Sequence, residues 1–228
     1  QDVVPGRMRA LTVTQGWTGL IAVKTRRTRA AGKALFDRVA GAVGLALISP
    51  LLAATAIAIR LDSPGPVFYT QTRVGQNGKP FTMWKFRSMY TDSAARRASV
   101  VKSGGDAGNE VMFKDRQDPR ITHVGRWIRR LSIDELPQLI NVVRGDMSLV
   151  GPRPALPVEV AKYDAEALRR LLVKPGLTGL WQISGRSDLS WASTVALDRH
   201  YVENRGGALD AKIFAGTLRA VIGGKGAY

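Results

Sequence analysis

The longest apolar stretch of the chain runs from Val39 to Ile59 and contains no charged residue. About 20 apolar residues suffice for a helix to cross a bilayer, so this stretch is long enough to be a membrane helix. Its middle reads Ser49-Pro50, and a proline inside a helix removes a backbone donor and favours a kink or a break. Three interpretations remain open: a re-entrant helix broken at Ser49-Pro50, a straight transmembrane helix, and a buried helix of a soluble core.

The charges beside this stretch favour the re-entrant interpretation. Lys33 and Arg38 precede it and Arg60 follows it. Because basic flanks tend to stay on the cytoplasmic side of a membrane, a straight span would carry one of them to the wrong side. A helix broken at Ser49-Pro50 returns both flanks to the cytoplasm, and Ser49 or other protein groups would then satisfy the freed backbone groups. We therefore predict a re-entrant helix over about residues 34–60.

A β-hairpin is predicted after the apolar stretch. Two strand-like runs, Val67–Val74 and Phe81–Met89, flank the sequence Gln76-Asn-Gly-Lys79. Asn-Gly between two such runs is a strong hairpin signal. The polar, Gly- and Ser-containing residues 90–110 predict a mobile loop.

Helical patterns dominate from about residue 122 onward. Leu209–Ile222 is amphipathic, which is typical of a helix that packs on a core or lies in a membrane interface. The predicted fold class is α+β, mainly helical, with a re-entrant membrane helix, interfacial amphipathic helices and a β-hairpin. Residues 1–32 are interpreted as a lead-in of one or two short strands and a linker, and residues 33–228 as the domain that follows it.

Composition narrows the partners. Lys and Arg number 34 against 18 Asp and Glu, a formal net charge of +16. Such an excess indicates nucleic acid, an anionic membrane or phosphorylated substrates. The chain has no Cys, which excludes disulfides, thiolate metal sites and Cys nucleophiles. His123 and His200 lie far apart in sequence, so a His-rich metal site is not expected.

The pair Asp134-Glu135 is the centre of the predicted chemistry. Ser132 and Glu135 have the spacing of a capping box, so a simple helix cap is one interpretation. A phosphate site is the other, because arginines surround the pair in sequence: Arg126, Arg129, Arg130, Arg144 and Arg153. Pro152 and Pro154 fix the backbone around Arg153, and a rigidly presented guanidinium suits bidentate phosphate recognition.

These groups fit phosphoryl transfer at a membrane. A carboxylate can attack a phosphorus atom and form an acyl phosphate. A neighbouring carboxylate can hold Mg²⁺ together with substrate phosphate oxygens and water.

Ordered motifs along the chain carry a family resemblance. They are Lys85-Phe-Arg-Ser-Met89, Asp118-Pro-Arg120, Leu131-Ser-Ile-Asp-Glu-Leu-Pro-Gln-Leu139, Asn141-Val, Arg144-Gly-Asp-Met-Ser-Leu-Val-Gly-Pro-Arg-Pro154, Lys174-Pro-Gly-Leu-Thr-Gly-Leu-Trp-Gln182 and Ser184-Gly-Arg186. Over about residues 33–228 the chain closely resembles the bacterial sugar transferase family, the monotopic phosphoglycosyl transferases. The resemblance implies a ping-pong transfer of a hexose-1-phosphate, galactose or glucose, from a UDP-sugar to undecaprenyl phosphate with release of UMP. It also implies a place at the cytoplasmic face of the bacterial inner membrane, in the first membrane step of polysaccharide, O-antigen or capsule synthesis.

The resemblance also implies roles for individual residues. Asp134 would be the nucleophile and Glu135 the Mg²⁺ partner, with both carboxylates at the metal. Arg129 would meet the phosphate of the polyprenyl acceptor. The other expected substrate-binding residues are Arg153 and Arg186 at the nucleotide-sugar, Lys85 and Arg87 in the basic site, Pro152 and Pro154 in the loop, and Asp198.

The lead-in and the tail Gly226-Ala-Tyr228 are similar to the longer galactose- and glucose-phosphate transferases of this family. Those members carry four membrane helices and a further domain before the catalytic unit. The expected partners are therefore the two substrates, membrane lipid and a second copy of the chain, which would associate through or with such a portion.

Three rival functions explain less of the sequence. A nucleic-acid-binding module would explain the net charge but has no use for the apolar stretch. A non-catalytic membrane scaffold would leave the acidic pair and the Gly-Pro-Arg-Pro sequence unused. A soluble metal-dependent glycosyltransferase commonly uses Asp-x-Asp, which this sequence lacks, and would release UDP in place of UMP.

Overall fold

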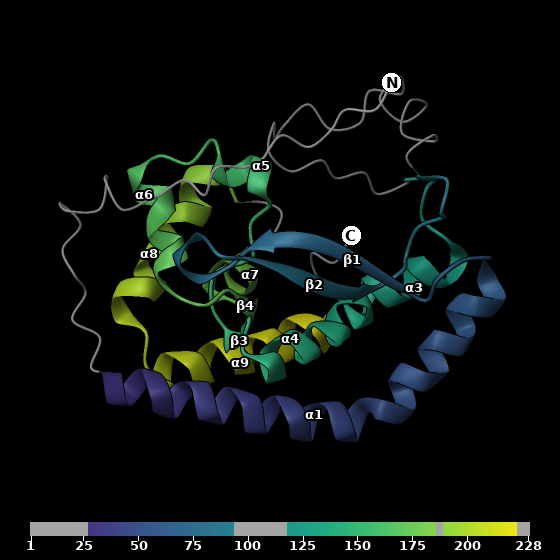
Figure 1. Ribbon diagram of the computed structural model, residues 1–228, viewed down its shortest axis with the longest axis horizontal. Coiled ribbons are helices and arrows are strands. Elements are labelled where there is room, and N and C mark those ends of the chain that lie inside the picture. The colour runs from purple at the N-terminus through teal and green to yellow at the C-terminus, as the bar shows by residue number, and fades with distance from the viewer. Residues whose placement is uncertain (1–26, 94–117, 186–188, 223–228) are drawn as a thin grey trace.

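The computed structural model describes residues 27–93, 118–185 and 189–222 of the 228-residue chain. These residues are mostly helical and form two small two-stranded sheets (Figure 1). In chain order the elements are α1 (Arg27–Asp62), β1 (Phe68–Val74), the 3-10 turn η2 (Gln76–Gly78), β2 (Pro80–Phe86), α3 (His123–Arg130), the 3-10 helix η3 (Ile133–Gln138), α4 (Leu139–Arg144), β3 (Ser148–Val150), α5 (Pro157–Val160), α6 (Ala165–Leu168), η4 (Arg169–Leu172), β4 (Gly176–Thr178), α7 (Leu180–Ser184), α8 (Trp191–Asn204) and α9 (Gly207–Ile222). The predicted mainly helical fold with a β-hairpin is confirmed.

A break was predicted at Ser49-Pro50, but the helix α1 continues through Pro50. Pro50 has no N–H to donate to the carbonyl of Ala46, four residues earlier. Ser49 Oγ donates to that same carbonyl at 2.8 Å. Because the hydroxyl replaces the missing backbone bond, the helix bends without ending, and Figure 1 shows its later, blue part turning away from its purple first part.

The helix also begins earlier than predicted, at Arg27, and so takes in the end of the predicted lead-in. The rest of that lead-in, and most of the predicted loop over residues 90–110, lie outside the described residues. Within the described residues one helix, Ala31–Asp62, is long and apolar enough to cross a membrane, and only 11% of its most apolar window is buried. This exposure argues against a buried core helix. The large apolar side chains that α1 exposes are Leu35, Phe36, Val39, Val43, Leu47, Leu51, Ile57 and Leu61.

One face of α1 packs along the rest of the protein. In its first half, a Cβ added at Gly41 would lie only 3.2 Å from the side chain of Val142, so α4 approaches the α1 backbone closely. At its end, Ile59 is buried in a cluster with Phe86 of β2 and Ile128 of α3. Both halves of α1 therefore contact the same folded unit.

The predicted hairpin is confirmed. β1 and β2 are antiparallel, with Phe68 opposite Phe86 and Val74 opposite Pro80. Asn77 and Gly78 form the turn with positive φ angles of 57° and 77°, the backbone conformation that Asn and Gly adopt most readily.

A second pair of strands was not predicted. β3 and β4 are parallel and three residues each, too short to give a recognisable sequence pattern. Val150 of β3 packs in a buried cluster with Tyr201 of α8 and Ile213 of α9. The amphipathic pattern of α9 thus serves core packing in its first half, whereas Leu218 further along is 52% exposed.

Candidate active site

The acidic pair lies in η3, which packs against β2. Lys85 Nζ of β2 donates to Glu135 Oε1 at 2.6 Å, although the two residues are 50 positions apart in sequence. The structure therefore brings Lys85 to the acidic pair and does not leave it facing solvent.

The capping-box interpretation is not supported. Ser132 occupies the N-cap position of η3, but its side chain makes no cap hydrogen bond. Its backbone is left-handed, with φ of 55°, a conformation that costs a non-glycine residue roughly 1 kcal/mol and is frequent at functional sites. Glu135 directs its carboxylate to Lys85, so the pair is held by tertiary contacts and not by a helix cap.

The two carboxylates differ in their ionisation. Loss of hydration and the adjacent Glu135 raise the pKa of Asp134 to about 6, and Lys85 and Arg129 only partly offset this rise. At neutral pH Asp134 is therefore mostly ionised but poorly stabilised as an anion. Such a carboxylate is more basic than an ordinary one, which favours attack on an electrophile.

Glu135 is stabilised in its charged form. Loss of hydration alone would raise its pKa, but Lys85, Arg153 and Arg73 outweigh this effect and lower the pKa below its usual value. Glu135 therefore remains an anion under conditions in which Asp134 begins to bind a proton.

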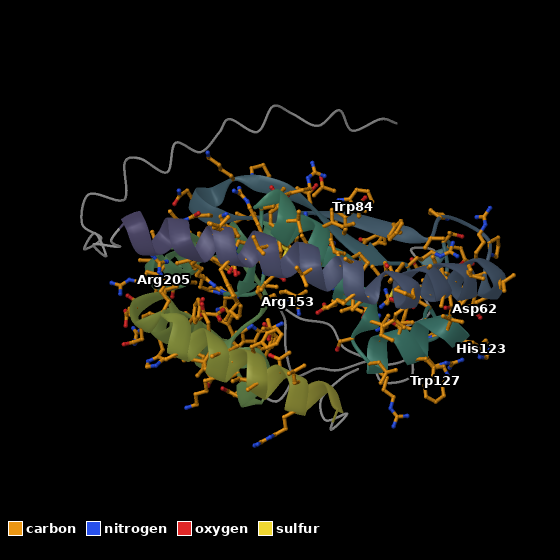
Figure 2. The ribbon with its side chains drawn as sticks, turned by 90° about the horizontal axis from the view of Figure 1, so that it is seen from below. Asp62, Trp84, His123, Trp127, Arg153 and Arg205 are labelled. Atoms are coloured by element: carbon orange, nitrogen blue, oxygen red, sulfur yellow. The ribbon has the colours of Figure 1, made fainter. Side chains whose placement is uncertain are left out.

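The loop that carries Arg153 is fixed by backbone hydrogen bonds. It follows β3 directly, and Gly151 N donates to Thr178 O at 2.8 Å while Pro152 O accepts from Gly176 N at 2.8 Å. The backbones approach so closely that a Cβ at Gly151 would lie 2.5 Å from the carbonyl of Lys174. Arg153 thus leaves a rigid pair of strands, and Figure 2 shows it in the middle of the molecule.

Arg73 of β1 is a residue of this site that sequence reasoning missed. It is 6% exposed, and its Nη1 donates to the carbonyl of Pro154 at 3.0 Å. Burial is the main cause that lowers its pKa to about 10, and the nearby Arg153 lowers it further. The sequence shows Arg73 only as a lone arginine inside a strand-like run, and such a residue is usually interpreted as a solvent-facing side chain.

Arg87 has a different place from the one predicted. It is 6% exposed and donates to the carbonyls of Ser63 at 2.6 Å and Pro64 at 2.7 Å, and to Ser63 Oγ at 3.0 Å. These groups form the turn after α1. We correct the prediction accordingly: Arg87 holds this turn through its Nη1 and Nη2 groups.

Asp198 also lies apart from the acidic pair. It is buried in α8, and its Oδ2 is 2.7 Å from Nε of Arg170, although burial still raises its pKa to about 6. The guanidinium of Arg170 lies over the rings of Tyr163 and Trp191 at 5.5 and 5.3 Å. Arg153, Arg170, Tyr163 and Trp191 line one small pocket, so Asp198 supports the wall behind Arg153.

The donor set at the acidic pair fits a metal shared with substrate. Across the described residues, no group of three or more His, Cys, Asp or Glu side chains could hold a metal ion. Two adjacent carboxylates are nevertheless the usual protein contribution to Mg²⁺ sites that phosphate oxygens and water complete. Arg186, predicted at the nucleotide-sugar, falls outside the described residues.

Comparisons with known proteins identify related sequences. A family model described as bacterial sugar transferase matches residues 28–224. The exopolysaccharide production protein ExoY of Rhizobium meliloti (strain 1021) is 43% identical over 198 residues, which cover 86% of this chain and 88% of ExoY.

Two longer relatives match the same part of the chain. The undecaprenyl-phosphate galactose phosphotransferase of Salmonella typhimurium is 42% identical, over 86% of this chain and 41% of that protein. The undecaprenyl-phosphate glucose phosphotransferase of Komagataeibacter xylinus is 44% identical, over 86% of this chain and 37% of that protein. The chain thus corresponds to nearly all of ExoY and to less than half of these two.

Proposed function

The chain belongs to the bacterial sugar transferase family and is a transferase enzyme, and on this premise we propose that it transfers a hexose-1-phosphate from a UDP-sugar to undecaprenyl phosphate. Asp134 attacks the phosphorus atom next to the sugar. The bond between this phosphorus and the bridging oxygen breaks, and UMP leaves with that oxygen. A phosphate oxygen of undecaprenyl phosphate then attacks the phosphosugar, which restores the Asp134 carboxylate and gives undecaprenyl diphosphate-sugar. Two successive displacements at one phosphorus replace a single displacement between two bulky anions.

The observation that carries this proposal is the unequal acidic pair in a cationic surrounding. Glu135 is paired with Lys85, whereas Asp134 has a pKa of about 6 and is left as the more basic anion. Four basic side chains, Lys85, Arg129, Arg153 and Arg73, act on two carboxylates, so the site carries surplus positive charge. Such a surplus suits phosphorylated substrates, whose transfer depends mainly on positioning and charge neutralisation.

The proposed substrate contacts follow from the two sides of the pair. Arg129 acts on Asp134 from α3, at the end of the molecule where Trp127 is 64% exposed (Figure 2). This position supports a contact with the phosphate of a lipid acceptor. Arg153 acts on Glu135 from the loop after β3, which supports a contact with the nucleotide-sugar.

Mg²⁺ is the proposed cofactor, held by Glu135 and Asp134 together with phosphate oxygens. When bound, it would neutralise charge on the diphosphate of the donor. Lys85 keeps Glu135 deprotonated and in place for this role.

We also propose that α1 enters the membrane and returns to the same, cytoplasmic face. Asp37 near its start accepts from Ser148 Oγ at 2.7 Å, and Asp62 at its end accepts from Val124 N at 3.1 Å. A straight span would carry one of these ends to the far side of the bilayer, away from its partner. The bend that Figure 1 shows and the exposed apolar side chains are compatible with a re-entrant helix.

The sugar is proposed to be galactose or glucose, and the pathway to be synthesis of a surface polysaccharide. Two relatives are named as galactose and glucose phosphotransferases, and ExoY as an exopolysaccharide production protein.

A panel of UDP-sugars tests the proposal. The full chain in detergent or nanodiscs is incubated with undecaprenyl phosphate, Mg²⁺ and each donor, and the released nucleotide is identified. Release of UMP with formation of the lipid diphosphate-sugar is expected from at least one UDP-hexose. Release of UDP, or no nucleotide from any donor, contradicts the proposal.

A further inference from the structure

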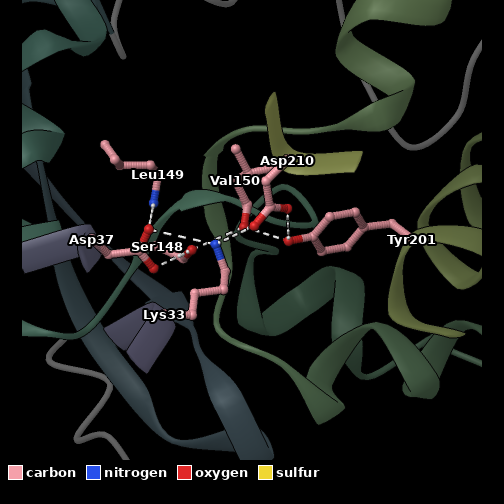
Figure 3. Close-up of polar contacts among 7 residues, drawn as sticks. All are labelled: Lys33, Asp37, Ser148, Leu149, Val150, Tyr201 and Asp210. Carbon is pink, nitrogen blue, oxygen red and sulfur yellow. Dashed lines mark hydrogen bonds and ion pairs between the residues drawn. The ribbon is translucent and has the colours of Figure 1, made fainter. Parts of the chain in front are cut away.

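A partly buried polar network joins the start of α1 to the core of the protein. We call it the Asp37 network, and its members are Lys33, Asp37, Ser148, Tyr201 and Asp210 (Figure 3). Its residues come from α1, β3, α8 and α9, which are far apart in sequence. Figure 3 shows these side chains converging around the backbone of β3.

Asp37 is the part of the network that contacts β3 directly. Its side chain is 5% exposed, and its two oxygens accept from Ser148 Oγ at 2.7 Å and from Leu149 N at 3.4 Å. Lys33 lies one helical turn earlier, with its Nζ 3.4 Å from Asp37 Oδ1 and 2.8 Å from Asp210 Oδ2. A buried carboxylate is costly unless it is paired and hydrogen-bonded, and here both conditions hold.

Tyr201 closes the network from the other side of β3. Its hydroxyl lies 2.9 Å from Val150 O and 2.9 Å from Asp210 Oδ1. Burial and the nearby Asp210 raise the pKa of Tyr201 well above its usual range, so the hydroxyl keeps its proton and acts as a donor. The network therefore bonds to β3 at Ser148, Leu149 and Val150, which is the whole strand.

The strand leads directly to Arg153. Arg153 lies five positions after Ser148, a reach of at most about 17 Å even when fully extended. Between them the backbone is tied to β4 by the bonds of Gly151 and Pro152. A shift of α1 relative to β3 would therefore displace the guanidinium of Arg153 as well. A displacement of about 1 Å at a reacting group can cost roughly 100-fold in rate.

We propose that the Asp37 network is a positioning device that holds Arg153 in register with the membrane helix. In this arrangement the depth at which α1 sits in the lipid and the place of the donor phosphate are set by one group of contacts. This inference rests on the proposed function in one respect, that Arg153 meets the donor.

The kinetic test compares the two ends of α1. Asp37→Asn removes the negative charge of the carboxylate that contacts both Ser148 and Lys33. Ser148→Ala removes a single hydroxyl and so disturbs folding less. Asp62→Asn is the matched control, because it makes the same change at the other end of the same helix. The donor kcat/KM of the full chain is expected to fall about 10- to 100-fold in Asp37→Asn, less in Ser148→Ala, and less than about twofold in the control.

Two further readings separate positioning from general damage. The acceptor kcat/KM is expected to change less than about threefold in Asp37→Asn, whereas loss of folded protein would lower both constants equally. In the double variant Asp37→Asn with Arg153→Lys, the donor kcat/KM is expected to be no lower than in Arg153→Lys alone, because both changes act on one contact. Losses that multiply, or equal falls in both constants, overturn the proposal.

Hydrogen exchange keeps the inference testable apart from activity. The amides of Leu149 and Gly151 are expected to exchange faster in Asp37→Asn and Ser148→Ala than in the wild type and in Asp62→Asn. Unchanged exchange overturns the positioning device even if activity falls. If the wild type turns over no donor, the proposed function fails, while faster exchange still supports the link between α1 and β3.

Discussion

Lys85 Nζ lies 2.6 Å from Glu135 Oε1, so the lysine neutralises the second carboxylate of the acidic pair and leaves Asp134 the less stabilised of the two. This contact divides the pair into one firmly charged group and one basic group. Two neighbouring carboxyl groups can take different chemical roles when their surroundings push their pKa values apart.

The pH dependence of the donor reaction follows from Asp134. Its pKa is about 6 and it must be ionised to attack, so kcat/KM for the donor should be constant above about pH 7 and fall about tenfold per unit well below pH 6. Lys85 lowers the pKa of both carboxylates, so Lys85→Met should move this acid limb to higher pH. Lys79→Met, an exposed lysine on the same hairpin, serves as the control. An acid limb that Lys85→Met leaves in place would contradict this role of the lysine.

Asp134→Asn should stabilise the protein while it removes activity. The folded-state pKa of Asp134 is about 6 against an ordinary 3.8, so between these values the folded state binds more protons than the unfolded state. Stability from this group is therefore lost as pH rises through that window. Thermal unfolding at pH 7.5 should show a gain of about 1 kcal/mol for the variant after solvent screening, and no gain near pH 4.

Glu135→Gln is the control of opposite sign. Because the pKa of Glu135 is lowered in the folded state, its charge contributes stability above its ordinary pKa, and that contribution is lost as pH falls. The variant should unfold more easily than the wild type at neutral pH. Equal effects of the two substitutions would contradict the division of the pair.

Arg73→Lys should weaken the donor reaction without unfolding the protein. A lysine keeps the charge but cannot reproduce the bonds that the guanidinium makes to Pro154 O and to Gln71 Oε1. The donor kcat/KM should fall about tenfold, mainly through KM, because the Arg153 loop loses a fixed contact. Arg144→Lys, at an exposed position, should leave the donor kcat/KM and the donor KM unchanged. A normal donor KM in Arg73→Lys would remove Arg73 from the site.

Arg87→Lys should affect stability and not substrate binding. Its guanidinium holds the turn after α1 through Ser63 and Pro64, so the substitution should cost about 2 kcal/mol of unfolding free energy. Unfolding in detergent and the donor KM of the remaining folded enzyme measure the two effects separately. A raised KM with unchanged stability would restore the substrate role that the sequence motif implied.

The long apolar helix α1 was partly predictable. The uncharged stretch Val39–Ile59 identifies it, because composition alone decides whether a helix can lie in lipid. Its continuity through Pro50 was not predictable, since it depends on the bond from Ser49 Oγ to one carbonyl. Proline signals a kink, but whether the helix ends there is decided by such local contacts.

The candidate site was predictable in its motifs and not in its tertiary contacts. Asp134, Glu135 and Arg153 were identified because their sequence surroundings are distinctive. The partner of Glu135 comes from a strand 50 residues away, and the anchor of Pro154 is a buried arginine of another strand. Arg87 lies in the same motif as Lys85, yet it holds the end of α1. A sequence motif alone does not distinguish catalytic from supporting residues.

Intact-protein mass spectrometry after incubation with donor and Mg²⁺, and without acceptor, tests the central claim most directly. The account predicts that wild-type protein gains the mass of one hexose phosphate, that peptide mapping finds it on Asp134, and that added undecaprenyl phosphate removes it. Asp134→Asn should gain no mass and should not turn over. A hexose phosphate on another residue, or full turnover by Asp134→Asn, would contradict the account.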